Sequence, residues 1–337
     1  MRPTSDGATV EPTVDRQRRG AGQLISLGVA LTLAGVLLYY SLRGIEWRHV
    51  ASIIAGAKPW LLTVAAAIST TSLLLRAIRW RILLNAEGAV PVATAFWAVA
   101  AGYFGNNFLP ARAGELVRTL MISSRSGLDI AYVLATALSE RVADAVALVA
   151  IAAVVLLTLP QPPGWLAGAA RPFAILALAG VTIIALLPRL EPFGRMLIGR
   201  TPLPARLRGK LFDILAHGLR GIRAFHDARR LIAFLALTIV IWSMEAVFTM
   251  VTGAALGLSI PVTVALLLVA ALGLGSALPS TPGYIGIYQF VAVTVLVPFG
   301  FSRTNSIAYI LVAQALAYVV TGVWGAIGFL QYRREKP

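Results

Sequence analysis

Long apolar runs separated by short polar segments repeat along most of the chain. A helix needs about 20 consecutive apolar residues to cross the ~30 Å hydrocarbon core of a bilayer. The runs that approach or exceed this length are Leu24–Ser41, Trp60–Leu75, Val146–Leu159, Pro172–Leu187, Leu231–Leu256 and Ile307–Leu330. The pattern predicts an all-α polytopic membrane protein with about six full transmembrane helices. We expect residues 23–331 to form a single membrane domain.

Two further apolar stretches are interrupted by proline and glycine. The segments Leu109–Glu115 and Leu278–Tyr284 both begin Leu-Pro-x-x-x-Gly and lie about half a chain apart. Because lipid cannot satisfy bare backbone groups, such breaks persist where protein or a polar cavity surrounds them. Paired interrupted helices in corresponding halves are typical of a transporter's substrate site. We therefore predict two re-entrant hairpins, Val92–Ile122 and Val262–Val297, that enter from opposite faces as an inverted repeat.

The distribution of the net charge of +15 predicts the orientation. The connection Arg189–Arg230 carries ten Arg/Lys and three Asp/Glu residues, so the positive-inside rule places it in the cytoplasm. This loop would join two halves, about 23–188 and 231–331, with a disordered N-terminus (1–22) and a tail (332–337) also in the cytoplasm. In a membrane protein such basic excess indicates cytoplasmic loops and anionic lipid, not nucleic acid. We expect a multi-pass protein of the cytoplasmic cell membrane.

Composition excludes several kinds of chemistry. The chain has no cysteine, which excludes disulfides and thiolate metal sites. Its three histidines fall in predicted loops, and no Gly-rich phosphate loop of the Walker type is present. We therefore expect neither a cofactor nor a metal ion, and no consumption of ATP.

Polar residues flank the first break, and several of them could hold an anion. The break and its flanks comprise Asn106, Asn107, Pro110, Arg112, Gly114, Glu115 and Arg118. If Ala111 opens a half-helix, its free N–H groups and the Arg112 guanidinium form an anion site, most naturally for a phosphate. The two asparagines can cap the helix or donate to the same ligand. Alternatively, the two arginines only mark a cytoplasmic loop.

A second ionisable group, Glu140, Arg141 and Asp144, falls inside a long apolar stretch. Counted from Leu128, Glu140 lies near the middle of the bilayer core, at ~1.5 Å per helical residue. Glu140 and Asp144 are four residues apart and share a helix face. Charges at that depth are costly and by default functional. The alternative is a structural ion-pair lock between Arg141 and a neighbouring carboxylate.

Three further positions carry charge within or beside apolar runs. Glu245 is a lone acid that could neutralise Arg112 or Arg141, relay a proton, or serve as a buried packing partner. Arg76 and Arg79 would guide headgroups at the cytoplasmic rim, or simply snorkel to lipid phosphates. The second break supplies neutral hydrogen-bonding groups and its turn residues. These are Pro282, Gly283, Tyr284 and Gln289.

Four motifs occur in the order found in one family. They are Arg76-x-x-Arg79-Trp80, Asn107–Arg118, Ser139–Asp144 and Leu278–Tyr288. Through these motifs the chain resembles the flippase-like membrane domain of lysylphosphatidylglycerol synthases, and the resemblance covers residues from about Leu24 to Leu330. The resemblance implies a domain that moves or shelters an anionic or aminoacylated lipid headgroup. The soluble aminoacyltransferase domain of the two-domain relatives is absent here, so we expect the chain not to be an enzyme. Gln289 stands where the family often has Glu.

These observations lead to one functional hypothesis and two alternatives. We expect a lipid flippase that holds an anionic phospholipid or a polyprenyl-phosphate-linked lipid between the two broken hairpins. One alternative is a membrane-embedded transferase acting on a lipid phosphate. The other is a non-transporting scaffold that docks envelope-synthesis enzymes through the Arg189–Arg230 loop.

Overall fold

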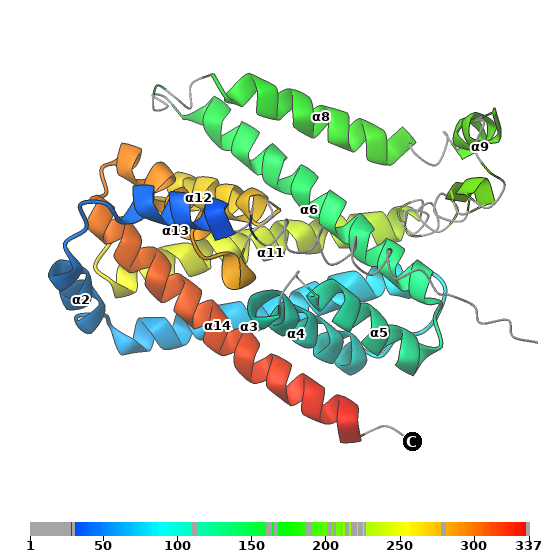
Figure 1. The fold of residues 1–337 in the computed structure, drawn as a ribbon, viewed down its shortest axis with the longest axis horizontal. Helices are drawn as coiled ribbons and strands as arrows, with labels where there is room; N and C mark the ends of the chain where they lie inside the picture. Colours follow the sequence, from blue (N-terminus) through cyan, green and yellow to red (C-terminus); the bar gives the residue numbers. More distant parts are fainter. Residues whose placement is uncertain are drawn as a thin grey trace, which may run out of the picture.

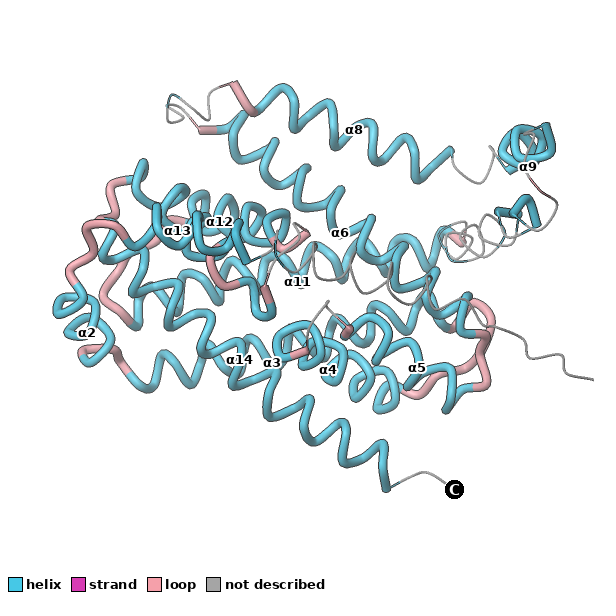
Figure 2. The backbone as a smooth tube through the Cα atoms, viewed as in Figure 1, coloured by secondary structure: helices cyan, strands magenta, loops and turns pink. Residues whose placement is uncertain are grey.

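The computed structural model consists mainly of helices in the residues that it describes (Figure 1). These residues are 28, 31–109, 113–159, 164, 168–186, 191–200, 227–277 and 281–334, with positions 204, 207–209, 211–212, 216, 221 and 225. Figure 2 shows helices joined by short loops, with no strand in this part of the chain. The predicted disordered segment 1–22 lies outside it, as do many residues of the Arg189–Arg230 loop, where α9 (Glu191–Arg200) is described.

Four helices are long and apolar enough to span a membrane. They are α3 (Pro59–Leu84), α6 (Ile130–Thr158), α11 (Ala228–Ala255) and α14 (Arg303–Arg334). With 26 to 32 residues each, they reach roughly 39 to 48 Å at ~1.5 Å per residue, which exceeds the ~30 Å core. Shorter apolar helices occupy the other two predicted spans, at Leu31–Leu42 and in α8 (Ala170–Leu186). The all-α polytopic membrane fold is therefore confirmed.

Each Pro/Gly break separates two short helices that pack as a hairpin. The first hairpin consists of α4 (Val92–Phe108) and α5 (Gly114–Ser126). The second consists of α12 (Val262–Gly275) and α13 (Ile287–Leu296), with the short 3-10 turn η4 (Pro282–Tyr284) between them. The longest of these helices has 17 residues, so at ~1.5 Å per residue none reaches across a ~30 Å core alone.

The two hairpins extend from opposite ends of the long helices (Figure 1). At one end the Tyr132 hydroxyl donates to the Leu83 carbonyl, which brings the start of α6 beside the end of α3. At the other end the Lys58 N–H donates to the Ala255 carbonyl, near the start of α12. The hairpin tips meet between these ends, where α4 contacts η4. That both hairpins are re-entrant in a bilayer stays a prediction.

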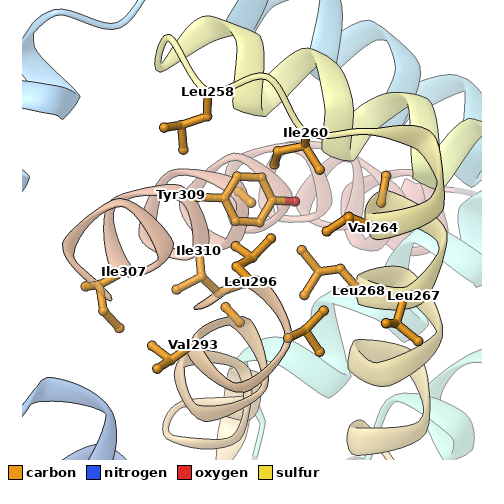
Figure 3. Packing of buried hydrophobic residues seen from close by; sticks show 14 of the residues in the cluster. Leu258, Ile260, Val264, Leu267, Leu268, Val293, Leu296, Ile307, Tyr309 and Ile310 are labelled. Carbon is orange, nitrogen blue, oxygen red and sulfur yellow. The ribbon is translucent and has the colours of Figure 1, made fainter. Parts of the chain in front are cut away.

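Helices from one half of the chain pack against helices from the other. α11 lies along α3, α14 along α4, and α12 against α6. One apolar cluster joins α12, α13 and α14 around Leu268, Leu296 and Tyr309 (Figure 3). A second cluster joins α3, α4, α5 and α6 around Trp80 and Tyr132. Because each half supplies part of the other's packing surface, neither hairpin is an isolated unit.

The length of α3 corrects one expectation about charge placement. The apolar run that ends at Leu75 predicts Arg76 and Arg79 at the cytoplasmic rim, but α3 continues to Leu84. Both arginines therefore lie one to two turns inside the helix and are buried. The helix continues through these arginines because carboxylates of the bundle pair with them: Glu245 with Arg76, and Asp144 with Arg79.

Helices α4 and α5 of the first hairpin approach so closely that position 114 must be a glycine. A Cβ at that position would lie 1.9 Å from the Gly102 carbonyl oxygen on α4 and 2.6 Å from Oδ1 of Asn106. Small residues allow helix backbones to approach this closely in membrane proteins.

We predict that Gly114→Ala forces α4 and α5 apart and lowers the Tm of the detergent-purified protein. Overpacking of this kind costs about 1–3 kcal/mol or more. Gly168→Ala is the matched control, because nothing lies within 4 Å of a Cβ built there. Equal Tm values for the two variants in a thermal unfolding assay would refute this account of the hairpin.

Candidate functional site

A cavity of about 250 Å³ lies where the two hairpin tips meet. Its wall includes residues from α3, α4, α6, α11, α12, η4, α13 and α14, so both halves of the chain contribute. Six predicted site residues lie in this wall. They are Arg76, Asn106, Asn107, Arg141, Glu245 and Tyr284.

Two guanidiniums in the wall share one aromatic ring. Arg76 from α3 and Arg141 from α6 each lie with the guanidinium carbon 5.8 Å from the Tyr103 ring centroid. Arg76 also lies 4.9 Å from the ring of Trp242. Aromatic faces stabilise a nearby cation, and here they hold two positive groups in a small volume. Such a pair of guanidiniums suits a phosphate or carboxylate.

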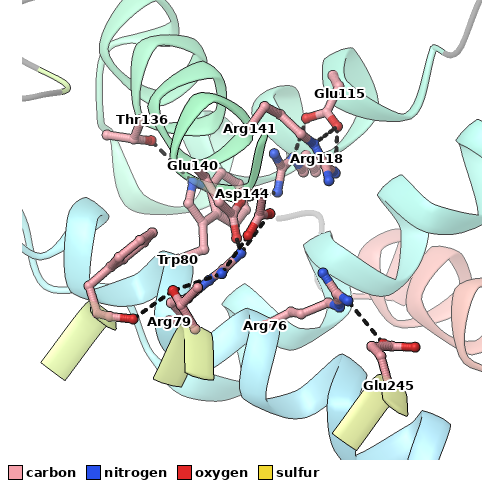
Figure 4. A network of polar contacts seen from close by, with 12 residues as sticks. Arg76, Arg79, Trp80, Glu115, Arg118, Thr136, Glu140, Arg141, Asp144 and Glu245 are labelled. Carbon is pink, nitrogen blue, oxygen red and sulfur yellow. Dashed lines mark hydrogen bonds and ion pairs between the residues drawn. The ribbon is translucent and has the colours of Figure 1, made fainter. Parts of the chain in front are cut away.

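Glu245 provides the carboxylate of the described wall. Its Oε1 accepts a hydrogen bond from Nη2 of Arg76 at 2.9 Å (Figure 4). The same oxygen accepts from the Ser72 hydroxyl at 2.8 Å. The Glu245 side chain is 29% exposed, whereas that of Arg76 is 10% exposed. An anionic ligand can therefore reach the carboxylate side of this pair and compete for Arg76.

Behind the wall lies a buried network that we call the ion-pair lock: Arg79, Arg118, Glu140 and Asp144. Nη1 of Arg79 binds Asp144 at 2.7 Å, and its Nη2 binds Glu140 at 2.9 Å. Nη1 of Arg118 binds the other Glu140 oxygen at 2.9 Å. Figure 4 shows how these side chains converge from α3, α5 and α6. Charges removed from water need such pairing, since an isolated buried charge is very costly. Among the described residues, Nε of Arg79 and Nη2 of Arg118 are buried without a hydrogen-bond partner.

Glu115 connects the ion-pair lock to the cavity. Its two carboxylate oxygens bind Arg118 at 2.6 Å and Arg141 at 2.8 Å. Across the lock and the cavity the described network contains four arginines (Arg76, Arg79, Arg118, Arg141) and four carboxylates (Glu115, Glu140, Asp144, Glu245), so its formal charge is zero. The sequence left open an ion-pair lock between Arg141 and a neighbouring carboxylate. In the structure Arg141 pairs with Glu115 and faces the cavity, while Arg79 is the central cation of the buried network.

Neutral hydrogen bonds hold the second break. The Gly283 carbonyl accepts from Nε2 of Gln314 at 2.6 Å and from the Tyr318 hydroxyl. Gln289 accepts from the Gly286 N–H at 2.7 Å and donates to Gln314 at 2.8 Å. Gly283 adopts the left-handed conformation with φ 70°, where a Cβ would collide with Tyr318. Gln289 thus stabilises the turn from behind and is not in the described cavity wall.

The first break is held by its asparagines. Oδ1 of Asn106 accepts a hydrogen bond from the Gly114 N–H at 3.1 Å, and Nδ2 of Asn107 donates to the Thr321 hydroxyl on α14 at 2.9 Å. The described part of α5 begins at Gly114, not at Ala111. Two predicted site residues, Pro110 and Arg112, lie outside the described residues, as does the side chain of Pro282.

The remaining predicted residues support the cavity from outside its wall. Arg79, Glu115, Arg118, Glu140, Asp144, Gly114, Gly283 and Gln289 are not among the described wall residues. For the charged residues of this list, ion pairing explains why they lie outside the wall, because buried charged side chains point toward their partners. The wall residues that sequence reasoning missed include several aromatic ones, of which Tyr103, Trp242 and Tyr318 are examples. Gln314 could have been found as a lone amide in an apolar helix.

The described residues contain no group of three or more His, Cys, Asp or Glu placed to hold a metal ion. Within this part of the chain the chemistry available at the cavity is therefore that of guanidinium, carboxylate, phenol, indole and amide groups. These groups can bind and orient an anion, and Glu245 can accept a proton.

We predict that Glu140→Gln strongly destabilises the protein, because it leaves Arg79 and Arg118 with less negative charge in a buried site. Breaking a buried pair costs about 3–5 kcal/mol. Glu87→Gln, on the exposed surface, is the matched control. Thermal unfolding in detergent measures the difference. A Glu140→Gln protein as stable as the control would show that the lock does not hold the bundle together.

Comparison with curated proteins finds a relative named glycosyltransferase AglD, from Haloferax volcanii. The two are 28% identical over 320 residues, which cover 85% of this chain and 50% of the relative. The chain thus spans about half the length of the curated relative that it matches. That name points to an enzyme and contradicts our expectation that the chain is not one. The expectation considered aminoacyl transfer alone, so it had no bearing on other reactions such as glycosyl transfer.

No solved structure matches the chain. The family model of the lysylphosphatidylglycerol synthase TM region matches residues 23–325, which is nearly the whole chain. This match agrees with the resemblance carried by the four sequence motifs. The chain belongs to the lysylphosphatidylglycerol synthase transmembrane-region family.

Proposed function

We propose that the protein binds the phosphate of a lipid headgroup between Arg76 and Arg141 and moves that lipid between the two leaflets. The observation that carries the proposal is the pair of guanidiniums on one tyrosine ring, in a cavity where two interrupted hairpins meet. Charged groups inside a membrane bundle by default mark a substrate pathway.

The cavity wall suits an amphiphile. Opposite the guanidiniums, α12 and α14 contribute apolar side chains such as Leu272, Ala313 and Val320. A phosphate at Arg76 would displace Glu245, which is the more exposed member of that pair. The exchange replaces one charge-assisted pair with another, and the phosphate gains Arg141 as a second guanidinium partner, so the site suits an anionic headgroup.

Movement of a hairpin tip would open the cavity to one side. The first hairpin is tied to α6 by the buried ion pairs of Arg118 and by Glu115. The tip of the second is held by neutral hydrogen bonds of Gln289, Gln314 and Tyr318. Neutral bonds contribute about 0.5–1.5 kcal/mol each, whereas breaking a buried ion pair costs about 3–5 kcal/mol. We therefore propose that the second tip moves while the first stays in place.

We further propose that the protein lies in the cytoplasmic cell membrane with both termini inside, as the charge distribution predicts. Its lipid would be an anionic phospholipid or a polyprenyl-phosphate-linked lipid. Docking of envelope-synthesis enzymes on the Arg189–Arg230 loop stays a prediction.

A second candidate is glycosyl transfer involving a lipid phosphate. One support is the name of the relative, of whose length the chain matches half. The other is Glu245, a carboxylate that faces the cavity and could accept a proton. If it holds, purified protein given a polyprenyl phosphate and a sugar donor will form a covalent product detectable by mass spectrometry. A Glu245→Gln protein that forms the product at the same rate would remove Glu245 from that reaction.

We predict that the double variant Arg76→Gln/Glu245→Gln loses lipid-phosphate binding while it stays folded. Removing both partners leaves no unpaired charge in the cavity wall, so the fold is not penalised by a lone buried ion. Loss of a charged hydrogen bond of about 1.5–3 kcal/mol lowers affinity roughly 10- to 100-fold. Native mass spectrometry measures the retained lipids, and a vesicle assay with fluorescent lipid measures movement between leaflets.

Arg48→Gln is the matched control for this experiment, because Arg48 is an exposed arginine on α2 (Trp47–Ala55), outside the described cavity wall. It should retain lipid and transport activity. Wild-type lipid retention and normal leaflet exchange by the double variant would refute the proposed function.

A further inference from the structure

We propose that the phosphate held at the cavity carries a single sugar, whose ring lies against the neutral aromatic side of the wall. This inference rests on the proposed function, because it names the headgroup attached to the bound phosphate. It follows from three properties of the described wall: the separation of charged from neutral residues, the abundance of aromatic rings, and the volume.

Charged residues are unevenly distributed over the helices of the cavity wall. The charged residues of the described wall come from α3, α6 and α11. The side formed by α12, η4, α13 and α14 contributes neutral residues, and its hydrogen-bonding groups are Ser276, Tyr284, Tyr288, Tyr309, Gln314, Tyr318 and Thr321. A ligand that fits both sides has an anionic part and a neutral part rich in donors and acceptors. A sugar phosphate has this composition.

Aromatic rings are concentrated in the wall. Five of the nine tyrosines of the chain line the cavity, together with Trp242 and Phe248. Tyr284 and Tyr288 lie parallel, with centroids 4.9 Å apart and an interplanar angle of 9°. The face of an aromatic ring is electron-rich, so it attracts the C–H face of a pyranose ring, while phenol hydroxyls can exchange hydrogen bonds with its hydroxyl groups.

Volume limits the headgroup to one unit. The cavity volume of about 250 Å³ is slightly below the roughly 300–1,000 Å³ of pockets that hold drug-sized ligands, which suits one compact headgroup and not an extended glycan.

Charge disfavours a cationic, aminoacylated headgroup. Within the described wall, Glu245 is the carboxylate that an ammonium could pair with, and it lies beside Arg76, the guanidinium proposed to bind the phosphate. An added ammonium would lie close to two guanidiniums, Arg76 and Arg141, and like charges at short range repel. The neutral hydroxyl groups of a sugar avoid that repulsion.

The test compares four short-chain probes on the full-length protein in detergent by isothermal titration calorimetry. They are citronellyl phosphate, its glucosyl or mannosyl phosphodiester, dihexanoyl phosphatidylglycerol, and the lysyl ester of that phosphatidylglycerol. Wild type should bind one glycosyl phosphodiester about tenfold or more tightly than citronellyl phosphate, since the sugar adds several hydrogen bonds. It should bind the lysyl ester more weakly than the parent phosphatidylglycerol.

The variant Tyr288→Leu tests the aromatic side of the wall. It should lower affinity for the glycosyl probe roughly three- to tenfold and leave affinity for citronellyl phosphate unchanged. Phe290→Leu is the matched control, because Phe290 lies on the same helix, is exposed, and is outside the described cavity wall. The comparison of probes on wild type needs no variant, so it decides the question even if Tyr288→Leu fails to fold.

The outcomes separate this inference from the proposed function. One outcome is that wild type binds the glycosyl probe and citronellyl phosphate equally, with both affinities lost in Arg76→Gln/Glu245→Gln. That result overturns the inference that the headgroup carries a sugar and retains the phosphate site. Preference for the lysyl ester also overturns the sugar. Failure of all four probes to bind, or binding unaffected by the double variant, overturns the proposed function itself.

Discussion

The ion-pair lock between α3, α5 and α6 is the interaction on which the rest of this structure depends. Arg79 is fully buried and binds both Glu140 and Asp144, while Arg118 binds the second carboxylate oxygen of Glu140. Inside a membrane bundle none of these charges can be left alone, because an unpaired ion there costs several kcal/mol. The helices that carry them must therefore come together in one register, which also positions the first hairpin.

This register separates the charged residues that stabilise the fold from the charged residues that face the cavity. The charges of the lock pair with one another, and Glu115 links the lock to Arg141, which with Arg76 faces the cavity beside Tyr103. A network with zero formal charge can hold two guanidiniums next to an open space without a bound ligand. When an anion enters, the partly exposed Glu245 is the group that yields. Binding and stability thus involve different residues of the same network.

The two breaks share a sequence pattern but are held by different chemistry. The first hairpin is fixed by ion pairs and by glycine-mediated contact between α4 and α5. The second is fixed by amide and phenol hydrogen bonds, with Gln289 as the inner support of the turn. This asymmetry explains why the substitution of Gln where the family often has Glu is tolerated: the residue bonds the backbone and Gln314, a role for which a neutral amide suffices.

The sequence by itself determined the membrane class, the six apolar regions, the two interrupted hairpins and the family, because these depend on composition, run length and local Pro/Gly chemistry. It also identified the charged residues that matter, since ionisable groups in apolar runs are conspicuous. Only the tertiary structure decided which of them pair and which face the cavity. Arg79 and Arg141 look alike in sequence, but pairing between helices distant in the chain buries one and leaves the other in the wall. The aromatic wall was equally invisible, because a tyrosine in an apolar helix has the same local pattern whether it faces lipid, core or cavity.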